Sequence, residues 1–324
     1  TRLVANNFSG SVLVARAGEV VLAKGYGLAR RDPPLPFTAE TVFDIGSITK
    51  PFTAAAILSL EMDGKVKTAD PITKYFTDVP ADKRDITLHQ LLTHTAGFVD
   101  SLGGDYERIG RDEFIRLALA SKLRSKPGAA YSYSNVGYSL LAAIVELVNQ
   151  KAYGQTLRER LLLRAGMQAT GYVEPEWSKL PVAHGYVKEK DWGTPLDHAW
   201  APDGPFWHLR GNGGLLSTVV DLYRWSVALE TDSILSRAAL EAHLTPKVSE
   251  GFLSGGSQYA YGWSVSKDRK GRRVIEHNGS NGIFFADLRM YPDERTVLIL
   301  ATNATGLKHM SELSRVSRLV LDDQ

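Results

Sequence analysis

Ser47 and Lys50 are the two residues of this sequence whose types and spacing most directly suggest chemistry. They stand three positions apart at the start of a segment, 48–63, whose apolar residues recur at helical spacing. Residues three apart on a helix share a face, so the serine hydroxyl and the lysine amine can approach each other. A lysine that is partly desolvated or close to other cations has a lowered pKa. It can then accept the hydroxyl proton and make the serine a nucleophile.

The motif has an alternative explanation, because serine is also a favoured N-cap residue at the start of a helix. The chain holds a second Ser-x-x-Lys, at Ser264 and Lys267, which ends a strand-like run before a charged turn. Side chains alternate between the two faces of a strand, so this spacing would point the two side chains apart. The second copy therefore predicts no site, and the assignment of Ser47 depends on the rest of the chain.

Two further short motifs bear on this assignment, and each occurs once in the chain. The first is Tyr133-Ser-Asn135, in a loop directly before an apolar helical segment, 136–149. The second is His277-Asn-Gly-Ser280, which ends a strand-like run and enters a turn. Tyrosine and histidine can transfer protons, and glycine permits close approach of the backbone.

Composition and charge exclude several classes of function. The 324 residues carry a net charge of +2 and no basic run, so no nucleic-acid partner is expected. The absence of cysteine excludes disulfides, thiolate catalysis and cysteine-ligated zinc. There is no His-Glu-x-x-His pattern and no phosphate-binding loop, so we expect neither a metal nor a cofactor. No apolar run reaches the roughly 18 residues that a membrane-spanning helix needs.

Strand-like segments stand at both ends of the chain, and helical segments lie between them. The predicted strands are a hairpin over 9–28, a short run at 41–45, and four late runs at 259–266, 272–277, 282–291 and 296–302. Hairpin connections favour an antiparallel sheet, which helices 48–63 and 307–321 would cover. We therefore predict an α/β fold of the α+β type, with a discontinuous sheet domain (1–66 and 205–324) and an inserted, mostly helical domain (67–204). The active site would lie in the cleft between them.

A long loop, 185–214, is rich in aromatic residues. We expect it to be ordered, and its stretch from Trp192 to Trp207 either packs between the lobes or also lines a substrate pocket. His94 is interpreted as a structural hydrogen-bonding residue, Tyr131 as a packing residue and Asp221 as a helix-capping residue.

In this order, the three motifs resemble those of the penicillin-recognising serine hydrolases, in particular the branch of class C β-lactamases, DD-peptidases and related esterases. The resemblance covers nearly the whole chain, because four longer runs also look like this branch: 41–53, 86–98, 127–138 and 213–222. It implies the β-lactamase/transpeptidase-like fold and a hydrolase that works through an acyl-enzyme.

The resemblance implies a role for each residue of the first two motifs. Ser47 would attack a carbonyl and carry the acyl group, while Lys50 would share the serine proton. Tyr133 would act as general base, as a phenolate or through Lys50, and would later activate the hydrolytic water. A nearby lysine cation would lower the pKa of the phenol for this role. Asn135 would hydrogen-bond the lysine and the substrate.

The third motif would bind the reacting group. The backbone N–H groups of Ser47 and Ser280 would form the oxyanion hole. Gly279 would let the substrate lie against the strand edge, because no Cβ intrudes. His277 departs from the family pattern, which usually has a lysine there to hold a substrate carboxylate. A mostly neutral histidine argues against β-lactams and favours esters, although Arg210 could supply a cation instead.

The sequence thus predicts a carboxylesterase of the β-lactamase-like type that acts on a small-molecule ester. One alternative is a class C-like β-lactamase, a D-Ala-D-Ala carboxypeptidase or a D-aminopeptidase, which would cleave an amide. A more remote alternative is a non-catalytic binding protein of the same fold. The oligomeric state stays open. Because the chain begins at Thr1 without a methionine, we expect that a leader or tag was removed. The expected location is therefore periplasmic or secreted, with the cytoplasm as the alternative.

Overall fold

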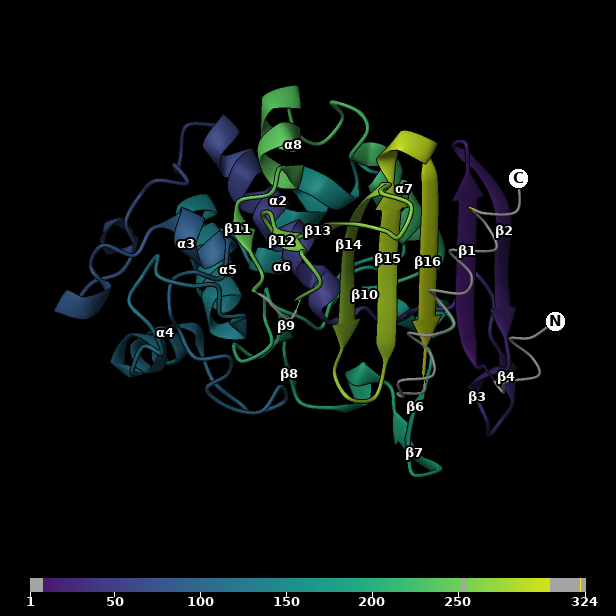
Figure 1. Cartoon of the computed structure of the whole chain (residues 1–324). Coiled ribbons are helices and arrows are strands. Elements are labelled where there is room, and N and C mark those ends of the chain that lie inside the picture. Colours follow the sequence, from purple (N-terminus) through teal and green to yellow (C-terminus); the bar gives the residue numbers. More distant parts are fainter. Residues whose placement is uncertain (1–7, 252–253, 304–320, 322–324) are drawn as a thin grey trace.

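The protein is built around one eight-stranded antiparallel sheet, in which the first strands of the chain lie beside the last one (Figure 1). The structure is a computed structural model that describes residues 8–251, 254–303 and 321. The strand order is β11-β12-β13-β14-β15-β16-β1-β2. The prediction that both ends of the chain share one antiparallel sheet is confirmed. The eight strands are β1 (Gly10–Arg16), β2 (Glu19–Tyr26), β11 (Val248–Ser249), β12 (Gln258–Tyr259), β13 (Ser264–Lys267), β14 (Arg273–Ser280), β15 (Phe285–Tyr291) and β16 (Thr296–Thr302).

The strands β1 and β16 carry apolar residues on both faces, because apolar clusters lie on both sides of the sheet there. In β1, Leu13 packs into the large core on the helix side, while its neighbours Val12 and Val14 pack into a second cluster on the opposite side. Leu321 belongs to this second cluster. Side chains alternate between faces along a strand, so a strand covered on both sides must be apolar throughout.

The helices lie mainly between the early and the late strands in the sequence. The predicted helix 48–63 is confirmed to within one residue as α2, and it packs against α5, α6 and α8, while α7 packs on β1 and β16. The predicted helix 307–321 lies almost entirely outside the described residues. The helices are α2 (Thr49–Met62), α3 (Leu88–Leu92), α4 (Arg111–Ala120), α5 (Asn135–Asn149), α6 (Tyr153–Leu157) with a π-helical turn after it (Arg158–Leu162), α7 (Val219–Ala228) and α8 (Arg237–Leu244).

Two predicted segments differ from the structure. The run predicted as one strand over 259–266 is two strands, β12 and β13, with a turn between them at Ala260–Trp263. The aromatic loop 185–214 holds two small hairpins. The sequence did not predict them, because strands of two to four residues are too short to show a periodic pattern. These strands are β6 (Gly185–Val187) with β7 (Lys190–Gly193), and β8 (Trp200–Ala201) with β9 (Gly204–Pro205).

The helical segments α3, α4 and α5 lie beyond the β11 end of the sheet, away from β1 and β2 (Figure 1). Two short strands, β5 (Phe43–Asp44) and β10 (Leu216–Ser217), pair with each other and connect the segment before α2 to the segment before α7. The division of the chain into 1–66 with 205–324 and 67–204 stays a prediction.

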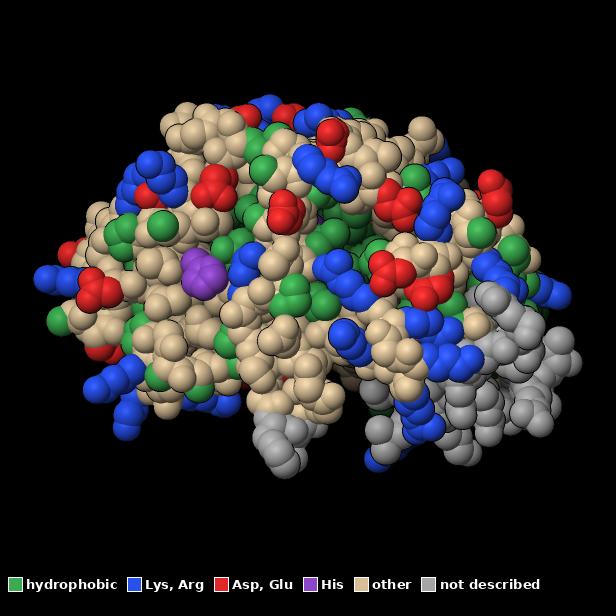
Figure 2. Space-filling view, turned by 45° about the horizontal axis from the view of Figure 1, so that its top comes forward, with side chains coloured by type: hydrophobic (Ala, Val, Ile, Leu, Met, Phe, Trp, Pro, Cys, Tyr) green, Lys and Arg blue, Asp and Glu red, His purple; other side chains and the backbone are tan. Residues whose placement is uncertain are grey.

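Charged side chains of both signs are interspersed over the face shown in Figure 2, as the small net charge leads one to expect. Within the described residues, no helix is long and apolar enough to cross a membrane.

Candidate active site

Ser47 and Lys50 meet where a short 3-10 turn, η1 (Gly46–Ile48), leads into α2. Lys50 Nζ lies 2.9 Å from Ser47 Oγ, 2.7 Å from Asn135 Oδ1 and 2.8 Å from the carbonyl oxygen of Asn212. The alternative view of Ser47 as the N-cap of this helix is wrong, because Ile48 occupies that position. The structure therefore brings the first two motifs together and adds Asn212, which the sequence did not single out.

Lys50 is fully buried, and burial lowers the pKa of its amine well below the usual range, while Asp100 and Asp105 oppose the shift. An uncharged amine has two hydrogens and one lone pair. The carbonyl oxygens of Asn135 and Asn212 can only accept, so they take the two hydrogens. The lone pair then faces the hydroxyl of Ser47, which is the geometry of a base ready to accept its proton.

Tyr133 lies beside this pair because α5 begins directly after it. Ser134 is the N-cap of α5 and accepts a hydrogen bond from Gly137 N, which fixes the turn that presents Tyr133. The amine of Lys50 lies 4.7 Å from the centre of the Tyr133 ring. His94 packs behind the tyrosine, with ring centres 4.3 Å apart, and its Nδ1 accepts from Ser134 N. His94 thus makes the structural hydrogen bond that its sequence context suggested.

The pKa of Tyr133 does not move in the direction that the sequence argument required. Burial raises it above its usual value, and hydrogen bonding with Ser47 only partly opposes the shift. Lys50 cannot supply the expected cation, because its own pKa is lowered. Tyr133 is therefore a neutral phenol at neutral pH, suited to pass a proton on rather than to start as a phenolate base.

The end of β14 forms the opposite wall of the site. β13 pairs with β14 only as far as Glu276, so the stretch His277–Ser280 lies past the last residue of that pairing. The turn η1 packs against this stretch. A Cβ added to Gly279 would come within 1.9 Å of Ile45 O and 2.6 Å of Ser47 N. Gly279 therefore makes room for the backbone of the nucleophile, and its expected role of leaving room for the substrate stays a prediction.

His277 is held neutral by its surroundings. Its Nδ1 donates to Asn278 O at 2.6 Å, and its Nε2 accepts from the hydroxyl of Tyr259 at 3.1 Å. Burial lowers the pKa of His277 to about 3. Arg210 does not replace the missing cation. It is buried elsewhere and pairs with Asp203 and Glu146, which corrects the suggestion made from sequence.

A cavity of about 380 Å³ opens over Ser47. Among the described residues that line it, none is Lys or Arg, and two carry carboxylates, Glu250 and Glu276. Tyr131, predicted only to pack, also lines it and donates to Glu250 at 3.3 Å. Neither Trp192 nor Trp207 lines this cavity. The lining residues are Ser47, Tyr131, Tyr133, Glu250, Tyr259, Ser264, Glu276, His277, Asn278, Gly279 and Ser280.

Four of these lining residues escaped the sequence argument: Glu250, Tyr259, Ser264 and Glu276. Tyr259, Ser264 and Glu276 lie on the neighbouring strands β12, β13 and β14, and Glu250 directly follows β11, so no short motif joins the four residues. The sequence predicts no site at Ser264, because residues three apart on a strand point to opposite faces of it. It lines the site for another reason, since its hydroxyl donates to Glu250 at 2.6 Å.

Asp221 is also not the capping group that was predicted. Thr218 caps α7 by accepting from Asp221 N, while the carboxylate of Asp221 accepts from Ala169 N and Thr170 Oγ1. It therefore connects α7 to the segment that follows the π-helical turn.

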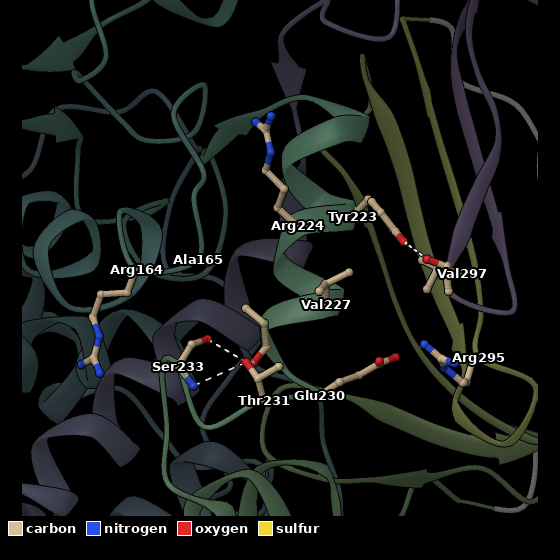
Figure 3. A pocket seen from close by; sticks show the side chains of 12 residues that line it. Arg164, Ala165, Tyr223, Arg224, Val227, Glu230, Thr231, Ser233, Arg295 and Val297 are labelled. Atoms are coloured by element: carbon tan, nitrogen blue, oxygen red, sulfur yellow. Dashed lines mark hydrogen bonds between the residues drawn. The ribbon is translucent and has the colours of Figure 1, made fainter.

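A second cavity, of about 430 Å³, lies between α7, the start of β16 and the turn between β1 and β2. Figure 3 shows Arg164 and Arg224 pointing away from each other, and Arg295 lying on the far side near Glu230. Because these cations do not converge and no serine–lysine pair lies among the lining residues, this cavity is no rival to the site at Ser47. Among the described residues, no group of three His, Asp or Glu side chains is placed to hold a metal ion.

The profile of the Beta-lactamase family matches residues 3–322, nearly the whole chain. The chain belongs to the Beta-lactamase family. Members of this family and their structural neighbours are serine hydrolases of the β-lactamase and penicillin-binding-protein fold, and the motifs at Ser47, Tyr133 and His277 lie within the matched range.

Among curated relatives, penicillin-binding protein 4* of Bacillus subtilis (strain 168) is 26% identical over 92% of this chain and 68% of its own length. Protein flp of Staphylococcus aureus (strain MW2) is 24% identical over 90% of the chain, which spans only 59% of that protein.

Among solved structures, the octameric penicillin-binding protein homologue from Pyrococcus abyssi has a TM-score of 0.85 and 28% identity, over 98% of this chain and 75% of that one. The D-amino acid amidase from Ochrobactrum anthropi SV3 has a TM-score of 0.84 and 23% identity, over 99% and 96%, and so shows the same fold. The predicted family and fold are confirmed.

Proposed function

We propose that this member of the Beta-lactamase family is a carboxylesterase that forms an acyl-enzyme on Ser47. The observation that carries the proposal is the buried amine of Lys50, which lies 2.9 Å from Ser47 Oγ and has two carbonyl acceptors for its hydrogens. A neutral amine in this position is a base for the serine proton.

In the proposed reaction, Ser47 Oγ attacks the ester carbonyl carbon while its proton passes to Lys50 Nζ. The negative oxygen of the tetrahedral intermediate accepts from the backbone N–H groups of Ser47 and Ser280. Tyr133 then gives its hydroxyl proton to the departing alkoxide and recovers one from Lys50. In the second half, a water attacks the acyl group and gives its proton back along the same route, which releases the acid and regenerates Ser47.

The choice of an ester follows from the charges around the cavity. His277 is neutral, Arg210 is engaged elsewhere, and the described lining residues include no Lys or Arg. A substrate carboxylate would therefore lose its hydration without gaining a cation partner, which is costly. An uncharged ester meets no such cost.

The test replaces the nucleophile. Ser47→Ala should abolish hydrolysis of p-nitrophenyl butyrate, while Ser178→Ala, an exposed serine far along the chain, should leave it unchanged. Exposure to a fluorophosphonate should add one adduct on Ser47, detected by peptide mass spectrometry. Retained turnover in Ser47→Ala would refute the proposal, and failure to label Ser47 would favour a non-catalytic protein of this fold.

One observation favours a second candidate, an amidase or aminopeptidase that acts on a substrate with a free amino group. Glu250 lines the cavity and its carboxylate bonds to two hydroxyls, those of Tyr131 and Ser264. A carboxylate with only neutral partners is suited to an ammonium group. A solved neighbour of the same fold is a D-amino acid amidase.

A substrate panel separates the candidates. Turnover of p-nitrophenyl butyrate above that of D-alanine p-nitroanilide supports the esterase, and the reverse order supports the amidase. Nitrocefin hydrolysis faster than both would favour a β-lactamase.

A further inference from the structure

The two backbone donors of the proposed oxyanion hole come from distant parts of the chain and are brought together by direct backbone contact. Ser47 lies in η1 and Ser280 ends β14. A Cβ added to Gly46 would lie 2.6 Å from Ser280 N, and one added to Gly279 would lie 2.6 Å from Ser47 N. Because no side chain separates these segments, a small shift of either one changes the distance between the two N–H groups.

One buried carboxylate spans the two segments. Asp44 Oδ1 accepts from Gly46 N at 2.7 Å, and its Oδ2 accepts from Asn281 Nδ2 at 2.9 Å. Gly46 directly precedes Ser47, and Asn281 directly follows Ser280. The carboxylate therefore bonds to the residue next to each donor, on both sides of the junction.

Both ends of this connection are anchored in regular structure. Asn281 Oδ1 accepts from Ile283 N at 3.0 Å and from Phe284 N at 2.8 Å, which closes the turn between β14 and β15. Asp44 lies in β5 and is paired with Leu216 of β10. The hydrogen bond between Asp44 and Asn281 thus connects β5 to the turn between β14 and β15.

The connection is costly for stability, which argues that it serves the geometry of the site. Asp44 is 1% exposed, and burial raises the pKa of its carboxyl to about 7, with the nearby Asp105 adding to the shift. Tyr106 also lies near it. A buried carboxylate that lacks a cation partner usually stabilises a fold less than an apolar group of the same size would.

We propose that Asp44 and Asn281 are positioning residues that hold the N–H groups of Ser47 and Ser280 at the spacing that binds a tetrahedral oxyanion. The inference rests on the proposed acyl-enzyme function. Neither side chain is assigned contact with the substrate, so their loss should affect the transition state more than substrate binding.

The pair offers an exchange test. In D44N, an amide donor faces the amide donor of Asn281, and in N281D two carboxylates face each other. In the double variant D44N/N281D, every hydrogen bond can reform with the roles exchanged. The amide at 44 then accepts from Gly46 N and donates to the carboxylate at 281, which still accepts from Ile283 N and Phe284 N.

Each single variant should lower kcat for p-nitrophenyl butyrate by at least about tenfold, with KM changed less than about twofold, because loss of one oxyanion donor costs about 10²–10³ in kcat. Affinity for an arylboronic acid, which forms a tetrahedral adduct on a serine, should fall in parallel. The double variant should recover kcat to within about threefold of the natural protein.

Rates are taken per active site, titrated with a fluorophosphonate, so that misfolded protein does not count. Single variants with natural kcat, or a double variant no better than the product of the two single effects, would overturn the proposal. If D44N does not fold, N281A is measured in its place. A kcat of N281A equal to that of the natural protein would also overturn the proposal. Turnover that survives Ser47→Ala would instead overturn the proposed function itself, which keeps the two failures distinct.

Discussion

Three oxygen atoms surround the amine of Lys50, and burial decides which protonation state of this amine is favoured. The two carbonyl oxygens bind hydrogens in either state, whereas Ser47 Oγ can give its own hydrogen only to a neutral amine. Since burial lowers the pKa of Lys50, the neutral state is reached at a lower pH than for an exposed lysine. Lysine is usually an exposed, charged residue, but the burial of Lys50 next to Tyr133 and Asn135 lets its amine act as a base.

Replacing this amine should remove the base while keeping the bulk of the side chain. Lys50→Met is expected to lower kcat/KM for p-nitrophenyl butyrate by about 10²–10⁴, the usual contribution of general acid–base catalysis. The assay is steady-state hydrolysis, with thermal unfolding as a control for folding. A folded Lys50→Met variant within tenfold of the natural rate would show that another group takes the proton.

Titration of His277 should not contribute to the pH dependence of kcat/KM. With a pKa of about 3, it stays neutral from about pH 4 upward. We therefore expect that kcat/KM shows no inflection near pH 6.5 that depends on His277. His277→Asn should change the height of the profile, measured from pH 5 to 9, but not its shape. An inflection near 6.5 that disappears in this variant would contradict the assigned neutral state.

Glu250 should matter only for substrates with a positive charge. A hydrogen bond to a charged group contributes about 1.5–3 kcal/mol, so Glu250→Gln should lower kcat/KM for D-alanine p-nitroanilide by about tenfold or more. The N-acetylated form of the same substrate is the matched control and should be unaffected, since it carries no ammonium group. Equal losses on both substrates would indicate that Glu250 only holds Tyr131 and Ser264 in place.

At the scale of elements, the site is the junction of η1 with the end of β14. Gly279 is at its closest point, where the neighbouring atoms belong to backbone and cannot rotate away. Gly279→Ala should therefore push η1 from the strand and lower kcat for the ester by about 10²–10³, comparable to loss of an oxyanion donor. Gly110→Ala is the control, because a Cβ there meets nothing within 4 Å. Natural kcat in Gly279→Ala would mean that the junction tolerates displacement.

The sequence could predict the parts of this junction that are local. Ser47 and Lys50 are one helical turn apart, and the periodicity of 48–63 was sufficient to place them on one face. The strands β1 and β14 to β16 were also predictable, because each has seven or eight residues. What the sequence could not predict depends on pairing between distant segments. Glu250 reaches the cavity only through the β11–β12 connection.

The same limit applies to the reason given for Gly279. The space beside its Cα is taken by Ile45 O and Ser47 N, and no pattern in the sequence indicates which backbone lies against a strand. The pKa of Tyr133 was expected to fall because a lysine lies near. The structure buries both groups, and burial is the largest influence on the pKa of each one. It raises the pKa of Tyr133 and lowers that of Lys50.

At the scale of the whole molecule, burial of titratable groups makes the free energy of unfolding depend on pH. Burial lowers the pKa of His94, His243 and His277. For each, the unfolded chain binds a proton below about pH 6.5 that the native state does not bind, so its contribution to stability is lost as the pH falls. Asp44 acts with the opposite sign. Its raised pKa means that the native state keeps a proton between about pH 7 and 3.8, which favours folding as the pH falls through that range.

His243 isolates one of these contributions away from the active site. It is fully buried on α8, its Nε2 accepts from Trp263 Nε1 at 2.9 Å, and its pKa is lowered to about 3. His243→Gln keeps an acceptor within reach of Trp263 but cannot titrate. The variant should gain stability relative to the natural protein by up to about 1.4 kcal/mol for each pH unit below 6.5. The measurement is urea unfolding of both proteins at pH 7, 6 and 5. The difference between their unfolding free energies should grow from 7 to 5 in favour of the variant. A difference that stays constant over this range would mean that His243 binds its proton equally well in the folded and unfolded chains, and that its burial has no part in acid sensitivity.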